Sequence, residues 1–492
     1  MRGSVTSYVR WVVRVIGGCA LAIALAAAAS ADERGDAAWL ARLREAARAR
    51  GFQGGVQSML VVERASGAEL FARHPERALA PASAQKILTA LAALEAFGAG
   101  HQFQTEVLAP ATPDAQGKVA SLAIRGADPA MTGEIWWRLA HDLRALGVTE
   151  VAGDVVLDDS LLDAERWHPS WFPVSARAYH APIGAMSANY GAFRVVISPG
   201  EALGAPGHVQ IDPPLPYFPL TNATRTAKRG AGPPLQVERA REPGGGERVT
   251  VTGAVALGSD RSEVWRSVID PTAYAAAVLR SQLEAAGIRV HGSVAPGIAP
   301  AESVLLYAFD GMPLRAEADL LLKYSNNFIA ETLLKQLGRL DSGAPGSWAN
   351  GSVALRARLA ALGLPLDGIT LVDGSGLSRD NRVSARLLVA ALRRADASFA
   401  IGPDLLAGLP IAAEDGTLRK RADGARGLVR AKTGTLDGVT SLAGWARTDS
   451  GRELVFAVIS NGHRHGDSLA IDAVDAFAAA LVHDGPREAA SR

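Results

Sequence analysis

Three short groups of polar residues in this 492-residue chain could together carry out nucleophilic chemistry. The first is Ser83-Ala84-Gln85-Lys86, at the start of an apolar, Ala- and Leu-rich run that predicts a helix over residues 84–97. Positions three apart on a helix are neighbours, so the Lys86 amine can take the proton of the Ser83 hydroxyl. Free N–H groups at a helix start also favour negative charge that develops there. The spacing predicts Ser83 as a covalent nucleophile and Lys86 as its general base, although an isolated Ser-x-x-Lys would more simply be a serine helix cap beside an incidental lysine.

Lysine is scarce in this chain, which strengthens the case for Lys86 as a residue that transfers a proton. Seven of the 51 Lys and Arg residues are lysine. An arginine cannot lose its proton in a protein, whereas a desolvated lysine ammonium can. Only Lys86 has a serine three residues before it. We expect most of the lysines outside the motifs to be surface residues without a role; these are Lys118, Lys228, Lys323, Lys335 and Lys420.

The second group is Ser325-Asn326-Asn327, which opens another predicted helix. A hydroxyl at Ser325 could relay a proton to a leaving amine, and the Asn327 amide could hold the Lys86 amine and a substrate amide. The simpler interpretation is that Ser325 is a helix cap. Ser187-Ala188-Asn189 has the same pattern, but it lies in a different, strand-rich part of the chain.

The third group is Lys432-Thr433-Gly434-Thr435, expected on a strand edge before the turn at Asp437-Gly438. Gly434 would let a substrate lie against the backbone, because glycine has no Cβ. Lys432, Thr433 and Thr435 offer a charge and hydroxyls that suit a terminal carboxylate. One such group alone would be weak; the three in this order are much harder to obtain by accident.

The elements that must position these groups divide the chain into helix-rich and strand-rich regions. Helical, Ala- and Leu-rich segments and a few strands occupy residues 32–100 and 300–484, whereas short strands and Pro/Gly-rich connections dominate 101–299. We expect one α/β (α+β) domain built from both flanks. Residues 101–299 would be a β-rich insertion of two domains whose ends lie close together, and 485–492 a polar tail.

The first 31 residues have the pattern of an export signal. Three arginines precede an apolar run that ends in Ala29-Ser30-Ala31, which predicts a signal peptide over 1–31, cleavage near Ala31 and a periplasmic protein. The run is too short for a stable membrane span. Its Cys19 is the chain's one cysteine, so the mature protein has no thiol chemistry. The net charge of +1 gives no reason to expect nucleic-acid binding.

Together the motifs resemble those of the class C low-molecular-mass penicillin-binding proteins, the D-alanyl-D-alanine carboxypeptidase/endopeptidase family. The resemblance extends to Gly126-Ala127-Asp128-Pro129, to the run Asp373-Gly374-Ser375-Gly376-Leu377-Ser378-Arg379, and to Asp415-Gly416-Thr417-Leu418. It implies a transpeptidase/β-lactamase-like domain, with an antiparallel sheet flanked by helices and interrupted by inserted domains. It also implies an acyl-enzyme on Ser83, an oxyanion hole made by the backbone N–H groups of Ser83 and Thr435, peptidoglycan peptides as substrates and β-lactams as inhibitors.

Two features differ from that family's pattern. Family members commonly carry an aspartate after a Trp-rich stretch, where it binds the far amine of diaminopimelate, but residues 171–177 contain no carboxylate. Ala413 stands where glycine is expected. The alternatives that remain open are a β-lactamase or esterase on the same fold and a catalytically silent peptidoglycan-binding protein. We expect no cofactor and no metal, because His463-Arg464-His465 is typical of a solvated turn and not of a zinc site.

Overall fold

The computed structural model describes residues 36–485. The signal peptide predicted over 1–31 and all but the first residue of the predicted tail lie outside the described residues. Within 36–485, no helix has the length and apolar character needed to cross a membrane.

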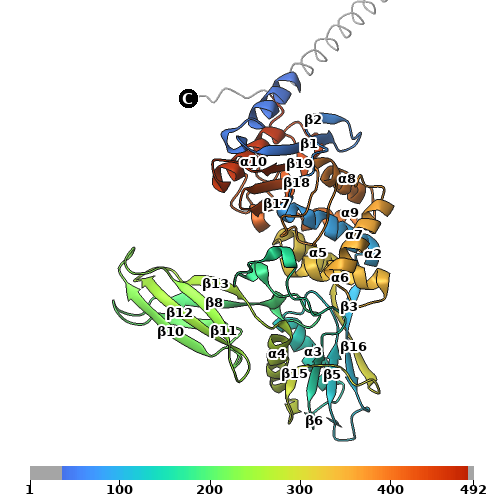
Figure 1. Ribbon diagram of the computed structural model, residues 1–492, viewed down its shortest axis with the longest axis vertical. Helices are drawn as coiled ribbons and strands as arrows, with labels where there is room; N and C mark the ends of the chain where they lie inside the picture. The colour runs from blue at the N-terminus through green and yellow to red at the C-terminus, as the bar shows by residue number, and fades with distance from the viewer. Residues whose placement is uncertain (1–35, 486–492) are drawn as a thin grey trace, which may run out of the picture.

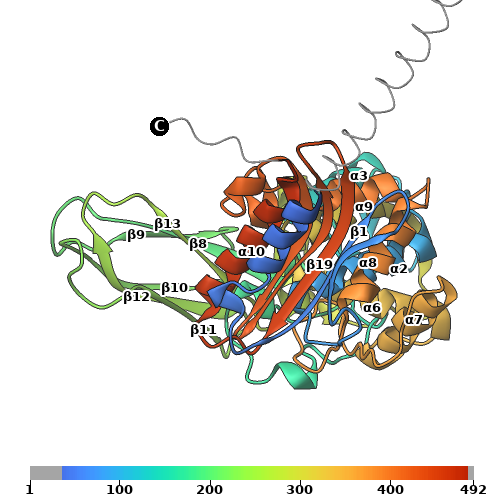
Figure 2. The same ribbon diagram turned by 90° about the horizontal axis from the view of Figure 1, so that it is seen from above.

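A five-stranded antiparallel sheet with both faces buried forms the centre of the part of the chain that carries the three motifs, the motif-bearing part (Figures 1 and 2). Its strand order is β17-β18-β19-β1-β2. The strands are β1 (Val56–Glu63), β2 (Glu69–Arg73), β17 (Val429–Leu436), β18 (Val439–Arg447) and β19 (Glu453–Asn461). Successive side chains of a strand point to opposite faces. On β19, Phe456 and Val458 therefore enter one core, while Ala457 and Ile459 enter the other.

Helices cover both faces of this sheet (Figure 2). On one face, a helix over residues 36–46 and α10 (Asp467–Val482) pack through Trp39, Leu43 and Phe477. On the other side lie α2 (Lys86–Phe97), α5 (Leu314–Lys323), α6 (Asn327–Ser342), α7 (Trp348–Ala361), α8 (Ala385–Asp396) and α9 (Gly402–Gly408). Helix α2 is the central one, because every residue from Lys86 to Leu94 is buried.

The segment between α2 and α5 leaves and rejoins the motif-bearing part at one place. Strands β3 (Gln102–Ala109) and β16 (Val304–Pro313) pair antiparallel, with Gln102 opposite Pro313. They belong to a second five-stranded sheet, β15-β7-β5-β3-β16, which packs with α3 (Gly133–Ala145) and α4 (Pro271–Ala285). Two three-stranded sheets, β10-β12-β11 and β13-β8-β9, project to one side (Figure 1). The remaining strands are β4 (Lys118–Val119), β5 (Leu122–Arg125), β6 (Glu150–Val151), β7 (Val155–Asp158), β8 (Ala192–Ser198), β9 (His208–Asp212), β10 (Leu220–Ala227), β11 (Gln236–Arg241), β12 (Glu247–Ala256), β13 (Ser262–Ser267), β14 (Arg289–Val290) and β15 (Val294–Gly297).

The predicted fold class is confirmed, with differences at the ends of elements. The helix expected over 84–97 begins as a 3-10 turn, η2 (Ala82–Gln85), and becomes α-helical only at Lys86. Helix α7 starts at Trp348, because Ser347 and Asn350 form a capping box with each other's backbone N–H.

Candidate active site

Ser83 and Lys86 lie against each other at the buried start of α2. The Lys86 Nζ donates to the Ser83 Oγ at 3.0 Å, to the Asn327 Oδ1 at 2.7 Å and to the Ser375 carbonyl oxygen at 2.9 Å. The Lys86 side chain is completely buried. The structure therefore brings this predicted pair together, on a 3-10 turn followed by an α-helix. Ser83 is not a helix cap, since neither η2 nor α2 has a side-chain cap.

The environment of Lys86 favours its neutral form near neutral pH. Burial lowers the pKa of the Lys86 ammonium from 10.5 to about 7, and the negative charges of Glu331 and Asp373 oppose that shift. An amine with this pKa is present in its neutral, proton-accepting form at pH 7. Lys86 thus combines the contact and the protonation state that a general base for Ser83 requires.

Two glycines let neighbouring segments approach the Ser83 turn closely. A Cβ on Gly434 would collide with Ser441 Oγ and lie 2.9 Å from the Ser83 amide nitrogen. A Cβ on Gly376, whose φ is +79°, would collide with the carbonyl oxygen of Ala82. The space that a Cβ on Gly434 would take is therefore occupied by Ser441 and the Ser83 turn, and the approach of substrate to the Gly434 backbone stays a prediction. Both glycines are needed to hold β17 and the loop that contains Gly376 against Ser83.

The two predicted residues at the start of α6 have different surroundings. Asn327 links the Lys86 amine to the inserted segment, because its Nδ2 donates to the Tyr179 carbonyl oxygen at 2.9 Å. Ser325 lines the same pocket as Ser83, with φ at +59°. The cap of α6 is Asn326, whose Oδ1 accepts from the Ile329 amide at 3.1 Å, so the alternative that Ser325 is the cap is wrong.

The predicted carboxylate-binding group on β17 is only partly presented to the pocket. Thr435 lines the pocket, whereas Lys432 is completely buried and its Nζ donates to the Thr433 carbonyl oxygen at 2.8 Å. Burial, followed by the charges of Lys86 and Arg421, holds the Lys432 pKa well below its ordinary value. Thr433 bonds to the Thr417 hydroxyl at 2.7 Å. Packing encloses the Lys432 side chain, and its role in binding a terminal carboxylate stays a prediction.

Two buried carboxylates hold the Asp373–Ser378 loop beside Lys86. Asp373 accepts from the Gly376 and Ser378 amides, at 2.8 and 2.6 Å, and from the Trp171 indole N–H at 2.9 Å. Glu331 accepts from the Gly374 and Ser375 amides at 2.9 and 2.7 Å. It also accepts from the Trp348 indole at 2.7 Å. These bonds fix the carbonyl of Ser375 where it meets the Lys86 amine, a role that sequence reasoning did not assign although it singled out this run.

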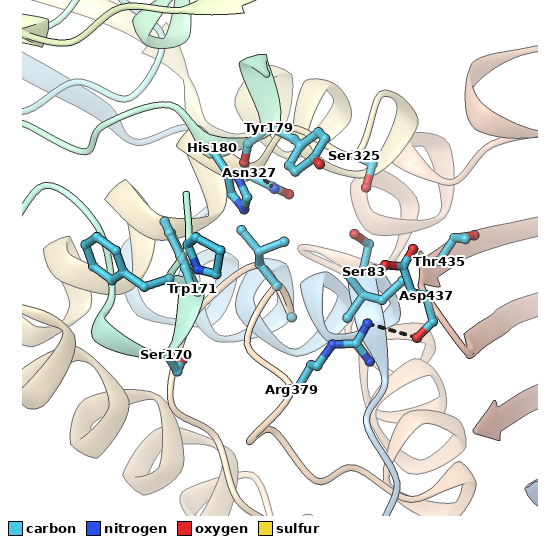
Figure 3. Close-up of a pocket in the computed structure, with 15 residues that line it drawn as sticks. Ser83, Ser170, Trp171, Tyr179, His180, Ser325, Asn327, Arg379, Thr435 and Asp437 are labelled. Atoms are coloured by element: carbon cyan, nitrogen blue, oxygen red, sulfur yellow. Dashed lines mark hydrogen bonds between the residues drawn. The ribbon is translucent and has the colours of Figure 1, made fainter. Parts of the chain in front are cut away.

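The pocket in front of Ser83 is lined by segments far apart in the sequence (Figure 3). One wall is the inserted stretch around Trp171, with Tyr179 and His180; the other carries Arg379 and Asp437. Arg379 Nη2 donates to the Asp437 carbonyl oxygen at 2.8 Å. Sequence reasoning missed these residues, apart from the Trp171 stretch and the Arg379 motif, because no local pattern marks them. The Trp171 stretch supplies no carboxylate to the pocket, as its sequence requires.

The weaker candidates lie elsewhere. Asn189 supports the fold: its Oδ1 accepts from the Gly133 amide at 2.8 Å and its Nδ2 donates to the Tyr274 hydroxyl at 2.8 Å. His463 bonds to Asp467 at 2.7 Å, and the described residues contain no cluster of three possible metal ligands.

Three of the five lysines outside the motifs are exposed, but Lys323 and Lys335 are buried. Lys335 Nζ pairs with Asp163 at 2.6 Å, and Lys323 Nζ pairs with Asp415 at 2.8 Å. These two lysines therefore have structural partners and are the exceptions to the expectation that most such lysines lie at the surface.

Comparison with known proteins places the chain in a family. Residues 40–481 match the model of the D-Ala-D-Ala carboxypeptidase 3 (S13) family. The chain is 35% identical over 459 residues to a D-alanyl-D-alanine carboxypeptidase of Actinomadura sp. (strain R39). This match covers 89% of this chain and 84% of that protein. It is 28% identical over 405 residues to the D-alanyl-D-alanine carboxypeptidase DacB of Haemophilus influenzae. This match covers 78% of this chain and 81% of that protein.

A crystal structure of penicillin-binding protein 4 (dacB) from Haemophilus influenzae has the same architecture. It superposes with a TM-score of 0.75 at 25% identity, covering 89% of this chain and 98% of that one. A second structure of the same protein, with a TM-score of 0.71, is of its complex with a β-lactam. The described geometry and these matches agree that the chain belongs to the D-Ala-D-Ala carboxypeptidase 3 (S13) family, a family of penicillin-binding proteins.

Proposed function

We propose that this protein hydrolyses peptidoglycan peptides through an acyl-enzyme on Ser83, acting as a D-Ala-D-Ala carboxypeptidase, a D,D-endopeptidase or both. The observation that carries the proposal is the 3.0 Å contact between Ser83 Oγ and the Lys86 Nζ, an enclosed amine with a pKa of about 7. A hydroxyl beside such an amine is an activated nucleophile.

In the proposed reaction, neutral Lys86 takes the Ser83 proton as Oγ attacks the carbonyl carbon of the penultimate D-alanine. The backbone N–H groups of Ser83 and Thr435 stabilise the resulting oxyanion. The proton then passes through Ser325 to the leaving amine as the peptide bond breaks. Water attacks the ester in a second step and releases the shortened peptide, which restores the Ser83 hydroxyl.

The other predicted residues would orient the substrate. Asn327 holds the Lys86 amine through its Oδ1, and its Nδ2 is bonded to the insertion. We assign the substrate's terminal carboxylate to the β17 edge, where Thr435 faces the pocket and Lys432 lies behind Thr433. A bound carboxylate would favour the charged form of Lys432, because an opposite charge nearby raises the pKa of an ammonium.

The same site suits β-lactams, which acylate the serine as the peptide does. A β-lactam complex of the related Haemophilus influenzae protein supports this assignment. Peptidoglycan lies outside the cytoplasmic membrane, so the proposed substrate agrees with export by the N-terminal segment and with a periplasmic location.

The test is mass spectrometry on the purified protein. Incubation with diacetyl-L-Lys-D-Ala-D-Ala should release one D-alanine, and benzylpenicillin should leave a stable adduct on the peptide that contains Ser83. Rapid turnover of penicillin without a stable adduct would instead indicate a β-lactamase or esterase. An intact protein that forms no adduct and cleaves no peptide would indicate a silent peptidoglycan-binding protein.

A further inference from the structure

A second groove adjoins the active-site pocket. It shares Tyr179, Ser325 and Asn327 with that pocket and continues away from Ser83 toward β13. Both the inserted segment and the start of α6 build it. A ligand that occupies the pocket can therefore extend into the groove without a break.

Exposed aromatic side chains line this groove. The exposed fractions are 46% for Tyr179, 50% for Trp265 and 66% for Tyr324. They come from three separate segments: η4 (Ala178–His180), β13 and the end of α5. Large aromatic side chains left open to solvent around a concavity are typical of binding sites, since their apolar faces gain by being covered.

The groove is also electrically neutral, in contrast to the pocket. Among the described residues that line it there is no Asp, Glu, Lys or Arg, and its polar groups are amides and hydroxyls such as those of Asn326 and Ser325. Arg194 lies over the Trp265 ring, 5.8 Å from its centroid, and pairs with Asp212 at 2.7 Å, so its charge is compensated. The pocket itself carries Arg379 and Asp437. A charged peptide strand would find no ionic partner among the groove residues.

We propose that the groove binds the N-acetylated sugar rings to which the substrate peptide is attached. This inference rests on the proposed function and extends its substrate from the peptide to the glycan. The apolar face of a pyranose ring covers an aromatic ring, while its hydroxyls and acetamido group exchange hydrogen bonds with neutral amides. Exposed aromatic rings among uncharged polar groups present that combination.

The direct test titrates the protein with a peptide-free tetrasaccharide of N-acetylglucosamine, measured by isothermal titration calorimetry. The native protein should bind it, and Trp265→Ala should weaken binding about two- to tenfold, the range expected for loss of one aromatic contact. Trp137→Ala is the matched control, because Trp137 is 47% exposed on α3 and lines neither the pocket nor the groove. Equal binding by Trp265→Ala and the native protein, or an equal loss in Trp137→Ala, would overturn the proposal.

A kinetic test compares a disaccharide-linked pentapeptide with the same pentapeptide without sugar. Trp265→Ala should lower kcat/KM for the sugar-linked substrate relative to the free peptide, and Trp137→Ala should leave that ratio as in the native protein. If Trp265→Ala instead impairs cleavage of a sugar-free peptide dimer and spares the sugar-linked monomer, the groove holds a second peptide and the proposal is wrong. A native protein that cleaves no peptide would refute the proposed function, while the titration would still decide the sugar site.

Discussion

Replacing Lys86 by arginine tests the proposed base directly, because it keeps a positive charge and removes the ability to accept a proton. With a pKa of about 7, about half of the Lys86 side chains are neutral at pH 7. A guanidinium stays protonated throughout the working range. General-base catalysis contributes about 10²- to 10⁴-fold in rate, so Lys86→Arg should lower the acylation rate by about that factor.

The assay is the second-order rate of labelling by a fluorescent penicillin, measured from pH 5 to pH 9. The pKa of Lys86 is lowered on folding, so the neutral, reactive form appears as pH rises through about 7. The native rate should rise about tenfold per pH unit below that value and level off above it. In Lys86→Arg, the remaining slow labelling should lose this inflection.

The control must separate lost chemistry from the cost of fitting a larger side chain into a buried site. Lys335→Arg serves, since Lys335 is also completely buried with a pKa lowered by burial, yet it pairs with Asp163 and does not line the pocket. Lys432→Arg would be a poorer control, because Lys432 is itself enclosed and is affected by the charge of Lys86. Labelling by Lys86→Arg within tenfold of the native rate, or a native profile without an inflection between about pH 6 and 8, would refute Lys86 as the base.

Three further changes test the rest of the site. Ser83→Ala should abolish labelling and lower the free energy of unfolding by only about 1 kcal/mol, because the change removes one hydrogen bond, that from Lys86. A variant that still labels would exclude Ser83 as nucleophile. Gly434→Ala should lower the acylation rate by at least about 100-fold and lower Tm, since the new Cβ would displace β17 from the Ser83 amide; native rate and Tm would contradict the described packing. Asp373→Asn removes a charge that raises the Lys86 pKa, so the inflection of the labelling profile should move to lower pH, and a shift to higher pH would contradict this account.

The parts of the site that were predictable from sequence are those encoded by local spacing. Ser83 and Lys86 are one turn apart, and Asn327 opens a helix of the same domain, so their motifs named them before their contacts were known. Apolar runs likewise predicted strands and helices in the two flanks of the chain, which form the central sheet and the helices that cover it. The approach of three motifs from distant parts of the chain was inferred from the family resemblance and not from any local rule.

What could not be predicted depends on long-range packing. The Asn327 amide meets a backbone carbonyl at Tyr179, and a carbonyl has no sequence signature. Lys432 lies on the expected strand, but whether its ammonium faces solvent or core depends on what packs against β17. The aromatic character of the groove is equally invisible in sequence, because Trp265 and Tyr324 come from segments that meet only in the folded protein.

The Asp373–Ser378 loop surrounds the Lys86 amine, and its Gly376 and Leu377 also line the pocket. Burial lowers the Lys86 pKa, and the charges of Glu331 and Asp373 oppose that shift, which leaves the pKa at about 7. Those carboxylates stay in place because backbone amides of the loop and the indoles of Trp171 and Trp348 donate to them. The loop in turn presents the Ser375 carbonyl to the amine at 2.9 Å. The same bonds therefore set both the position and the basicity of Lys86, so a change in this loop should shift the pH dependence of acylation.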